Sequence, residues 1–283
     1  MIQINNLRFN YPNGKTILND LTLHLESGKI YGLFGRNGEG KSTLIKLMAG
    51  LLFSKSGTCL VKGEDVSKRS ASALQDIFVI PENFELSALK IATFEKVNSV
   101  FYPKFSREQF YELIQEFKLL PTENISNLSF GQKKKVLIAF GISANTKLLL
   151  MDEPTNGLDI PSKSQFRKIL ASVINDEKCI VISTHQVRDL HNLIDHVIIL
   201  DQTKVLFDQS LSKISEHLWF GKTFQNIEDS FIYSDVSFGG KAIHHRKDKD
   251  ETEVDLELLF NAALSKTETI NNALKNSYRE TTV

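Results

Sequence analysis

The stretch that decides the fold runs from Lys29 to Gly50 and reads KIYGLFGRNGEGKSTLIKLMAG. Its first part, KIYGLFG, is a short apolar run typical of a buried strand, and its last part, LIKLMAG, has helical character. Between them lies GRNGEGKST, from Gly35 to Thr43. A strand, a glycine-rich loop and a helix in this order form the context that a phosphate-binding loop requires. The sequence therefore predicts a nucleotide site in this loop.

The residue types of the loop each have a physical role. The glycines let the backbone fold tightly, with its amide hydrogens turned inward towards an anion. The helix that begins near Lys41 adds the positive end of its dipole. We expect Lys41 to reach the β and γ phosphates and the Ser42 hydroxyl to bind magnesium. The nucleotide-binding residues predicted from the motif are Gly35, Asn37, Gly38, Gly40, Lys41, Ser42 and Thr43. A chance match is the alternative, and the strand and helix on either side argue against it.

Two acids follow a second apolar run, KLLLMDE, which ends at Glu153. Asp152, at the end of the predicted strand, is placed to hold magnesium. Glu153 is one residue further on and is a candidate general base for an attacking water. Seen alone, such an acid pair is also compatible with a turn or a helix cap. GTPases and small-molecule kinases share the phosphate loop, but no guanine-reading N-K-x-D element occurs, because Asn145 is followed by Thr146.

A third motif sets the class. Residues 128–132 read LSFGQ, and Ser129 and Gln132 have capping-box spacing before the helical stretch KKKVLIAFGI. With the phosphate loop before it and the acid pair after it, the chain resembles the nucleotide-binding subunit of an ATP-binding cassette (ABC) transporter over about residues 1–215. In that family the signature serine faces the ATP held by the other subunit. The resemblance therefore implies that Ser129, Gly131 and Gln132 act on a partner's ATP, and a plain helix cap is the alternative for Ser129.

Three further positions carry family roles. Tyr11 resembles the aromatic residue that stacks on adenine; the alternative is a core tyrosine, with Phe9 packing inward from the same strand. His185, in VISTH, resembles the switch histidine that contacts the γ-phosphate and braces the catalytic Glu153; the alternative is a surface residue at a strand end. Asp159, in NGLD, matches the loop that crosses to the partner subunit, and it also suits a helix N-cap. The resemblance thus implies Lys41, Glu153 and His185 as the catalytic residues.

The chain departs from the family pattern at Glu82. The segment IFVIPEN places glutamate where the family usually carries glutamine, the residue that contacts magnesium and the attacking water. A carboxylate still binds magnesium, but it adds repulsion near the phosphates. The predicted magnesium ligands are Ser42, Asp152 and Glu82. Some exporter-type and drug-resistance cassettes carry a similar P-E pair, so the resemblance favours an exporter of the ABC-2 type.

The predicted fold class is α/β, with a P-loop NTPase (RecA-like) core built from residues near 28–82 and 147–210. Residues 1–27 predict antiparallel strands that turn at Asn13-Gly14, and residues 56–66 predict a further hairpin. Together they form an N-terminal antiparallel β subdomain.

Residues of about 83–146 predict an inserted helical subdomain. In SREQFYELIQEFKLL, Ser106 and Gln109 have capping-box spacing, and one apolar face is formed by Phe110, Leu113, Ile114 and Phe117. In the family, the outer surface of this insertion receives a coupling helix from the membrane subunit. Phe101, Tyr102 and Phe105 are candidates for that surface, and the alternative is that they pack beneath the insertion.

From about residue 216 the resemblance thins. The stretch FIYSDVSFGGKAIHH predicts one or two strands, and VDLELLFNAALSK predicts a short amphipathic helix. We therefore divide the chain into an ABC ATPase domain at 1–215 and a small C-terminal α+β appendage at 216–283.

Composition excludes other classes. In 283 residues, 34 Lys and Arg balance 34 Asp and Glu, so no basic field predicts a nucleic-acid partner. The apolar runs are shorter than the roughly 18 residues that a membrane span needs. The amino terminus alternates like a strand and lacks the apolar core of a signal peptide. Cys59 and Cys179 lie in strand-like runs and are interpreted as buried thiols in a reducing cytosol.

Taken together, the sequence predicts an ATP-binding and ATP-hydrolysing subunit that powers transport by a separate integral membrane permease. Two copies, or one copy and a second ABC subunit, would clamp two Mg-ATP head to tail. The expected location is cytoplasmic, on the inner face of the cell membrane through the permease. A soluble ABC ATPase that switches on ribosomes or DNA is the alternative. Against it stand the single phosphate loop, the short distance between the motifs and the neutral charge. A binding-only regulator is disfavoured by the retained Lys41 and Glu153.

Overall fold

A six-stranded sheet at the centre of the molecule carries the predicted motifs. The computed structural model describes residues 1–12, 14–222, 231–235, 240–246 and 252–275. The strand order of this sheet is β10-β9-β3-β8-β7-β6. Its strands are β3 (Lys29–Phe34), β6 (Ile77–Ile80), β7 (Leu148–Asp152), β8 (Cys179–Thr184), β9 (His196–Asp201) and β10 (Lys204–Ser210). All neighbours are parallel except β10, which runs antiparallel to β9. The predicted α/β core is therefore present.

The central strands are largely apolar because both faces of the sheet are covered. Successive side chains of a strand point to opposite faces. In β3, Tyr31 and Leu33 join one core with helix α1 (Lys41–Met48) and the N-terminal sheet. Ile30 and Phe34 join a second core with the helices of the other side. The same alternation continues in the neighbouring strands, so the six-stranded sheet separates two apolar cores.

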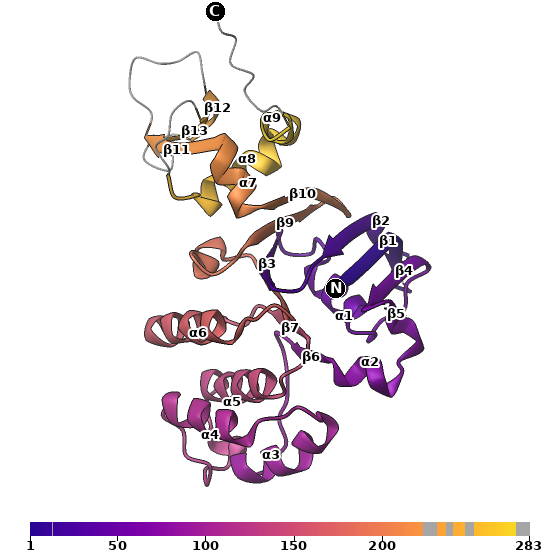
Figure 1. Ribbon diagram of the computed structural model, residues 1–283, viewed down its shortest axis with the longest axis vertical. Helices are drawn as coiled ribbons and strands as arrows, with labels where there is room; N and C mark the ends of the chain where they lie inside the picture. The colour runs from indigo at the N-terminus through magenta and orange to yellow at the C-terminus, as the bar shows by residue number, and fades with distance from the viewer. Residues whose placement is uncertain (13, 223–230, 236–239, 247–251, 276–283) are drawn as a thin grey trace, which may run out of the picture.

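An antiparallel sheet of four strands packs over the first core, on the right in Figure 1. Its order is β2-β1-β4-β5. The strands are β1 (Ile2–Asn10), β2 (Thr16–Leu25), β4 (Ser56–Val61) and β5 (Glu64–Asp65), followed by the short helices η1 (Val66–Lys68) and α2 (Ala71–Gln75). The predicted N-terminal β subdomain and the second hairpin are both found. At the predicted turn between β1 and β2, Asn13 lies outside the described residues, and Gly14 has φ 84°.

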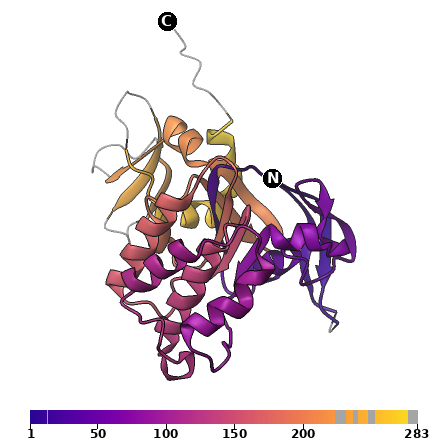
Figure 2. The same cartoon turned by 60° about the horizontal axis from the view of Figure 1, so that its bottom comes forward.

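The predicted helical insertion lies at the lower end of the molecule in Figure 1 and comes forward in Figure 2. It contains α3 (Ile91–Asn98), η2 (Ser99–Phe101), α4 (Arg107–Glu116), η3 (Ile125–Asn127) and α5 (Phe130–Ser143). Ser106 caps α4 by accepting the Gln109 N–H at 3.2 Å. The predicted apolar face of α4 and the residue after it is buried, at Phe110, Leu113, Ile114 and Phe117.

The three aromatic residues named as candidates for the outer surface of the insertion differ in their exposure. Tyr102 packs against Phe78 and Phe140, with ring centroids 5.4 and 5.9 Å away, and Phe105 lies 4.9 Å from Phe140. Phe101 is 65% exposed. Packing beneath the insertion is therefore the explanation for Tyr102 and Phe105, while only Phe101 remains available on the surface.

The C-terminal residues add a small sheet and two helices at the upper end of Figure 1. After α6 (Ile160–Val173), η4 (Val187–Leu190) and α7 (Leu211–His217) come β11 (Leu218–Lys222), β12 (Phe231–Asp235), β13 (Lys241–His245), α8 (Leu256–Ser265) and α9 (Thr267–Ala273). The sheet order is β11-β13-β12. The stretch predicted to hold one or two strands contains β12 and β13, with residues 236–239 outside the described part, and the predicted helix is α8; β11 and α9 were not predicted. The apolar side chains of this appendage belong to the same core as the insertion.

None of the described helices has both the length and the hydrophobicity of a membrane span.

Candidate nucleotide-binding site

The phosphate loop leaves the carboxyl end of β3 and enters α1 directly. Gly38 and Gly40 have φ of 89° and 96°, in the region that side chains other than glycine rarely adopt. A Cβ on Gly40 would lie 2.9 Å from Ile17 Cγ2, so close packing against β2 also requires glycine there. The first helical residue is Lys41. The loop therefore has the conformation and the helix start that the motif predicted.

The Lys41 side chain is buried and lies against its own loop. Its Nζ donates to the carbonyl oxygens of Gly35 at 2.7 Å and Arg36 at 3.2 Å. Burial lowers the pKa of Lys41, while the charges of Glu153, Asp152 and others work in the opposite direction. A phosphate in this position would replace the two carbonyl groups as the partner of the ammonium group.

A cavity of about 410 Å³ lies beside the loop. It is lined by Tyr11, Lys15, Ile17, Asn37, Gly38, Gly40, Lys41, Ser42, Thr43, Glu82, Glu153 and His185. Tyr11 Oη lies 3.2 Å from Thr43 Oγ1. The ring of Phe9 packs edge-on against Tyr11 at 4.9 Å and is itself buried. Phe9 thus faces the core, and Tyr11 faces the cavity. All the predicted nucleotide-binding residues line this cavity except Gly35, whose carbonyl oxygen accepts from Lys41.

The two acids lie at the same edge of the sheet as the loop because parallel strands end there; Glu153 lines the cavity and Asp152, which is buried, does not. In the register of the sheet, Asp152 lies opposite Ser183 of β8, and the Ser183 hydroxyl donates to Asp152 Oδ1. Glu153 follows with φ 46°, an uncommon backbone conformation for a residue with a side chain. This turn directs its carboxylate into the cavity rather than along the strand.

Three groups hold the Glu153 carboxylate. The Thr184 hydroxyl donates to Oε2 at 2.9 Å, and the His185 backbone N–H donates to Oε1 at 2.9 Å. His185 Nδ1 lies 2.7 Å from the same Oε1. The contact between His185 and Glu153 that the family resemblance implies is therefore present, and the remaining face of Glu153 is turned to the cavity.

Glu82 lies just beyond the end of β6 and lines the cavity. Asn156 Nδ2 donates to Glu82 Oε1 at 3.3 Å. Ser42, Asp152 and Glu82 supply only oxygen atoms, the donors that magnesium prefers, and magnesium usually keeps waters and binds substrate phosphates beside one or two carboxylates. Among the described residues no cluster of three or more histidine, cysteine or acidic side chains suits a metal ion. The donor set fits magnesium carried with a nucleotide.

The residues predicted to act on a partner's ATP lie apart from this cavity. Ser129 Oγ accepts the Gln132 N–H at 3.2 Å and Gln132 Oε1 accepts the Ser129 N–H at 2.9 Å, a complete capping box at the start of α5. A Cβ on Gly131 would lie 2.5 Å from the Gly157 carbonyl oxygen. Ser129 is exposed and none of these residues lines the cavity.

Asp159 caps α6 by accepting the Ser162 N–H at 2.9 Å, and the hydrogen bonds from Ser162 lower the pKa of this carboxyl group. The helix-cap reading of Asp159 is therefore correct as a local role.

Sequence reasoning did not single out several residues that shape the site. Ser183 and Thr184 hold the two carboxylates, and Asn156 contacts Glu82. Lys134 of α5 is fully buried and donates to the carbonyl groups of Pro81, Glu82 and Glu153. The signal for Ser183 and Thr184 was their place at the end of a predicted strand. The signal for Lys134 was hidden, because it is the middle one of three consecutive lysines.

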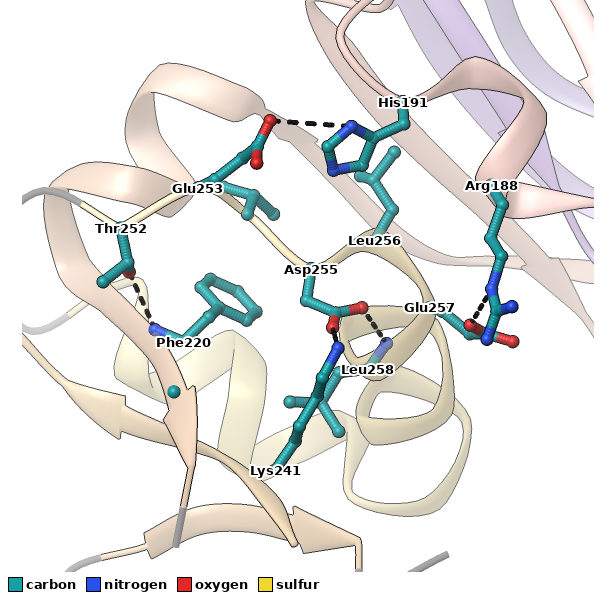
Figure 3. Close-up of a pocket in the computed structure, with 12 residues that line it drawn as sticks. Arg188, His191, Phe220, Lys241, Thr252, Glu253, Asp255, Leu256, Glu257 and Leu258 are labelled. Atoms are coloured by element: carbon teal, nitrogen blue, oxygen red, sulfur yellow. Dashed lines mark hydrogen bonds and ion pairs between the residues drawn. The ribbon is translucent and has the colours of Figure 1, made fainter. Parts of the chain in front are cut away.

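A second cavity, of about 560 Å³, lies between the segment after His185 and the appendage (Figure 3). Two pairs join the segment after His185 to the appendage: Arg188 lies 2.6 Å from Glu257, and His191 lies 3.5 Å from Glu253. A third pair, Lys241 with Asp255, lies within the appendage. None of the predicted nucleotide-site residues lines it. These pairs attach the appendage to the chain immediately following His185.

Comparison with known proteins places this architecture in a family. The model of the ABC transporter family matches residues 18–156. The lantibiotic transport ATP-binding protein SrtF of Streptococcus pyogenes is 30% identical over 215 residues, which cover 74% of this chain and 90% of SrtF. The methionine import ATP-binding protein MetN of Carboxydothermus hydrogenoformans is 31% identical over 238 residues, 77% of this chain and 69% of MetN. The chain belongs to the family of ABC transporter ATP-binding proteins.

The fold agrees with this membership. A solved structure of the ATP-binding subunit of an ABC transporter superposes with a TM-score of 0.69 at 24% identity, covering 76% of this chain and 91% of that one. The predicted α/β fold class is confirmed. Longer relatives from Bacillus cereus match 86% of this chain, and the chain spans 44% of their length.

Proposed function

We propose that this chain binds and hydrolyses ATP and that hydrolysis powers transport through a separate membrane-spanning partner. The observation that carries the proposal is the arrangement around Glu153. Its carboxylate is fixed by Thr184 and His185 and faces the same cavity as Lys41 and the phosphate loop. A base, an anion-binding loop and an oriented histidine at one place are what attack of water on a terminal phosphate requires.

In the proposed mechanism, the loop amides and Lys41 bind the phosphates, and the Tyr11 ring stacks on the base. Ser42, Asp152 and Glu82 would hold Mg²⁺, which supplies charge neutralisation on the phosphates. Glu153 accepts the proton of the attacking water, and His185 keeps the Glu153 carboxylate in position. The φ of 46° at Glu153 is the local strain that makes this orientation possible.

The exposed Ser129 leads us to propose that the working unit is a dimer, either of two copies or with a second ABC subunit. Ser129, Gly131 and Gln132 do not line the cavity of their own chain, so they would complete the site of the facing chain. Asp159, in the loop after Gly157, would cross the same interface. The start of α5 presents the positive end of the helix dipole and a serine hydroxyl, which suit a phosphate.

The Glu153→Gln variant tests both parts. It should bind ATP with unchanged affinity, release no phosphate and accumulate as a dimer with ATP, because the base is lost while the binding groups remain. The matched control is Glu177→Gln, an exposed acid before the amino end of β8, at the opposite edge of the sheet. Size-exclusion chromatography with ATP and a phosphate-release assay are the measurements. A variant that hydrolyses ATP at the wild-type rate refutes the role of Glu153, and one that stays monomeric with ATP refutes the shared site.

The insertion offers the surface for the membrane partner. Val97, Val100 and Phe101 of α3 and η2 are 47%, 69% and 65% exposed, and large apolar side chains grouped on a surface mark contact sites. A permease docked there would place the chain on the inner face of the cell membrane. The Phe101→Asp variant should keep ATPase activity and lose co-purification with an integral membrane protein from the native host. Undiminished co-purification would move the partner surface elsewhere.

Two finer points belong to the same proposal. Glu82, in place of the usual glutamine, favours an exporter of the ABC-2 type. The division into an ATPase domain at 1–215 and an appendage at 216–283 is proposed with the boundary inside α7, which runs from Leu211 to His217. Vesicle transport assays of the assembled complex decide the direction, and limited proteolysis near residue 215 tests the boundary.

A further inference from the structure

Lys134 carries a charge that the mechanism above does not use. It lies in the second turn of α5, five residues after Ser129, and its side chain is 0% exposed. A fully buried lysine is rare unless its charge is compensated, because removing an ammonium group from water is costly. No ion pair between described residues includes it, since none of the acids reaches its Nζ. The Lys134 ammonium group is therefore buried, at a cost in free energy, without an acidic side chain paired directly with it.

The Nζ group joins three segments of the chain. It donates to the carbonyl oxygens of Pro81 at 3.3 Å, Glu82 at 3.1 Å and Glu153 at 3.5 Å. These carbonyls follow the carboxyl ends of β6 and β7, which carry the acids of the nucleotide site. An ammonium group has three hydrogens, so all three are used on the backbone. One cation thus fixes the backbone of both acid-bearing loops relative to α5.

Two aromatic rings close the other side. Nζ lies 5.2 Å from the ring centroid of Phe84 and 5.5 Å from that of Phe130, and the two rings are 5.3 Å apart. Both distances fall within the range of a cation–π contact. Phe130 is the residue next to Ser129, so the rings extend the connection to the beginning of α5. The cation is enclosed by backbone carbonyls on one side and aromatic faces on the other.

The charges around Lys134 give it a second role. Burial lowers the pKa of Lys134, while the negative charges of Glu82, Asp152 and Glu153 act in the opposite direction and favour its protonated form. Glu82 brings one more negative charge into a site that must also accept phosphates. A buried positive charge behind the Glu82 and Glu153 loops offsets this repulsion, and removing it leaves the acids to repel one another.

We propose that Lys134 is a positioning residue for ATP hydrolysis, which holds the Glu82 and Glu153 loops to the helix that begins at Ser129 and compensates the charge of Glu82. This inference rests on the proposed function. Because Ser129 and Lys134 lie on one helix, a shift of α5 on contact with a partner's nucleotide moves the carbonyls on which Glu82 and Glu153 depend. Lys134 thereby links the partner-facing end of α5 to the hydrolytic centre of its own chain.

The test is a double-mutant cycle of Lys134→Met and Glu82→Gln. Lys134→Met keeps the length of the side chain and removes its charge; Lys133→Met, on the same helix and half-buried, is the matched control. For Lys134→Met we expect kcat to fall by about 10- to 100-fold, as for other residues that orient groups of a metal site. Affinity for ATP without Mg²⁺ should change by less than about threefold, because Lys134 touches none of the residues of the phosphate loop. Lys133→Met should retain wild-type kcat.

The cycle has an outcome that a merely structural lysine does not produce. Glu82→Gln should lower the thermal midpoint or leave it unchanged in the wild type and raise it in the Lys134→Met background, and it should restore part of the lost kcat there. The midpoints are measured without nucleotide, so they test the charge coupling even if the chain proves to have no ATPase activity. A lack of ATPase activity would refute the proposed function, and the midpoints would still decide whether Lys134 and Glu82 are coupled by charge.

Additive effects on the midpoint and on kcat, or a Lys134→Met variant with wild-type kcat, overturn the inference. If Lys134→Met does not fold, the double variant decides: its recovery in soluble form supports charge compensation, and its failure to fold assigns Lys134 a purely structural role.

Discussion

Ser129 combines a local role with a proposed role towards the partner, and one series of substitutions separates them. Its Oγ accepts the Gln132 N–H at 3.2 Å, and Gln132 returns the bond at 2.9 Å, so Ser129 is the N-cap of α5. Its exposed hydroxyl is also the group that we propose to contact the ATP of the facing chain. Stability in the absence of nucleotide reports the first role, and hydrolysis reports the second.

The magnitudes differ enough to be distinguished. Ser129→Ala removes the cap and should cost about 1 kcal/mol of unfolding free energy, a fall of roughly 2–4 °C in Tm for a chain of this size. Aspartate and asparagine cap helices about as well as serine, so Ser129→Asp and Ser129→Asn should stay within about 0.5 kcal/mol of the wild type. Two like charges about 4 Å apart near a protein surface repel by about 4 kcal/mol. An aspartate that faces the phosphate should therefore weaken ATP-dependent dimer formation by about a thousandfold.

The assays are thermal unfolding without nucleotide, phosphate release at saturating ATP, and ATP-dependent dimer formation in the Glu153→Gln background. Ser129→Asn is the control for Ser129→Asp because the two side chains have nearly the same shape and differ in charge. We expect Ser129→Asp to keep the wild-type Tm while losing dimer formation and hydrolysis far more severely than Ser129→Asn. Equal activity of these two variants would refute the proposed contact with phosphate and leave Ser129 as a helix cap.

Three further predictions concern other parts of the structure. Tyr11→Ala should weaken ATP binding by about 1–3 kcal/mol through lost stacking, whereas Tyr11→Phe should bind nearly as the wild type in a titration with fluorescent nucleotide; equal losses would exclude stacking. Gly131→Ala should destabilise the protein by about 1–3 kcal/mol, since its Cβ would meet the Gly157 carbonyl at 2.5 Å, and an unchanged Tm would show that this contact relaxes freely. Burial raises the pKa of the Cys59 and Cys179 thiols to about 12, so both stay protonated at pH 8 and iodoacetamide should alkylate them only after unfolding, as mass spectrometry would detect.

Local sequence was sufficient where a structure is built from neighbouring residues. The phosphate loop needs a strand, three glycines and a helix start in succession, and all of them lie between Lys29 and Met48. The capping box at Ser129 needs only residues three positions apart. The apolar face of α4 follows from helical periodicity, as the burial of Phe110 and Ile114 confirms. These features depend on backbone geometry that a short segment sets by itself.

The sequence pattern could not predict the directions in which side chains point in irregular segments. The sequence left Phe101, Tyr102 and Phe105 as one candidate surface group. In the structure, Tyr102 and Phe105 turn towards Phe140 of α5, and Phe101 turns to solvent. No periodic pattern distinguishes these positions, because the chain between η2 and α4 is irregular and the contact is with a helix far along the sequence.

The sequence by itself determined that this chain has a phosphate loop, an acid pair and a second capped helix, in an order that indicates an ABC ATPase. Only the tertiary structure decided which side chains act together. The parallel register brings the ends of β3, β6, β7 and β8 to one edge, and there Thr184 and His185 hold Glu153 while the buried Lys134 of α5 spans two loops. These contacts join residues tens of positions apart, and they form only when hydrophobic burial on both faces of the sheet fixes the strand order and the place of each helix.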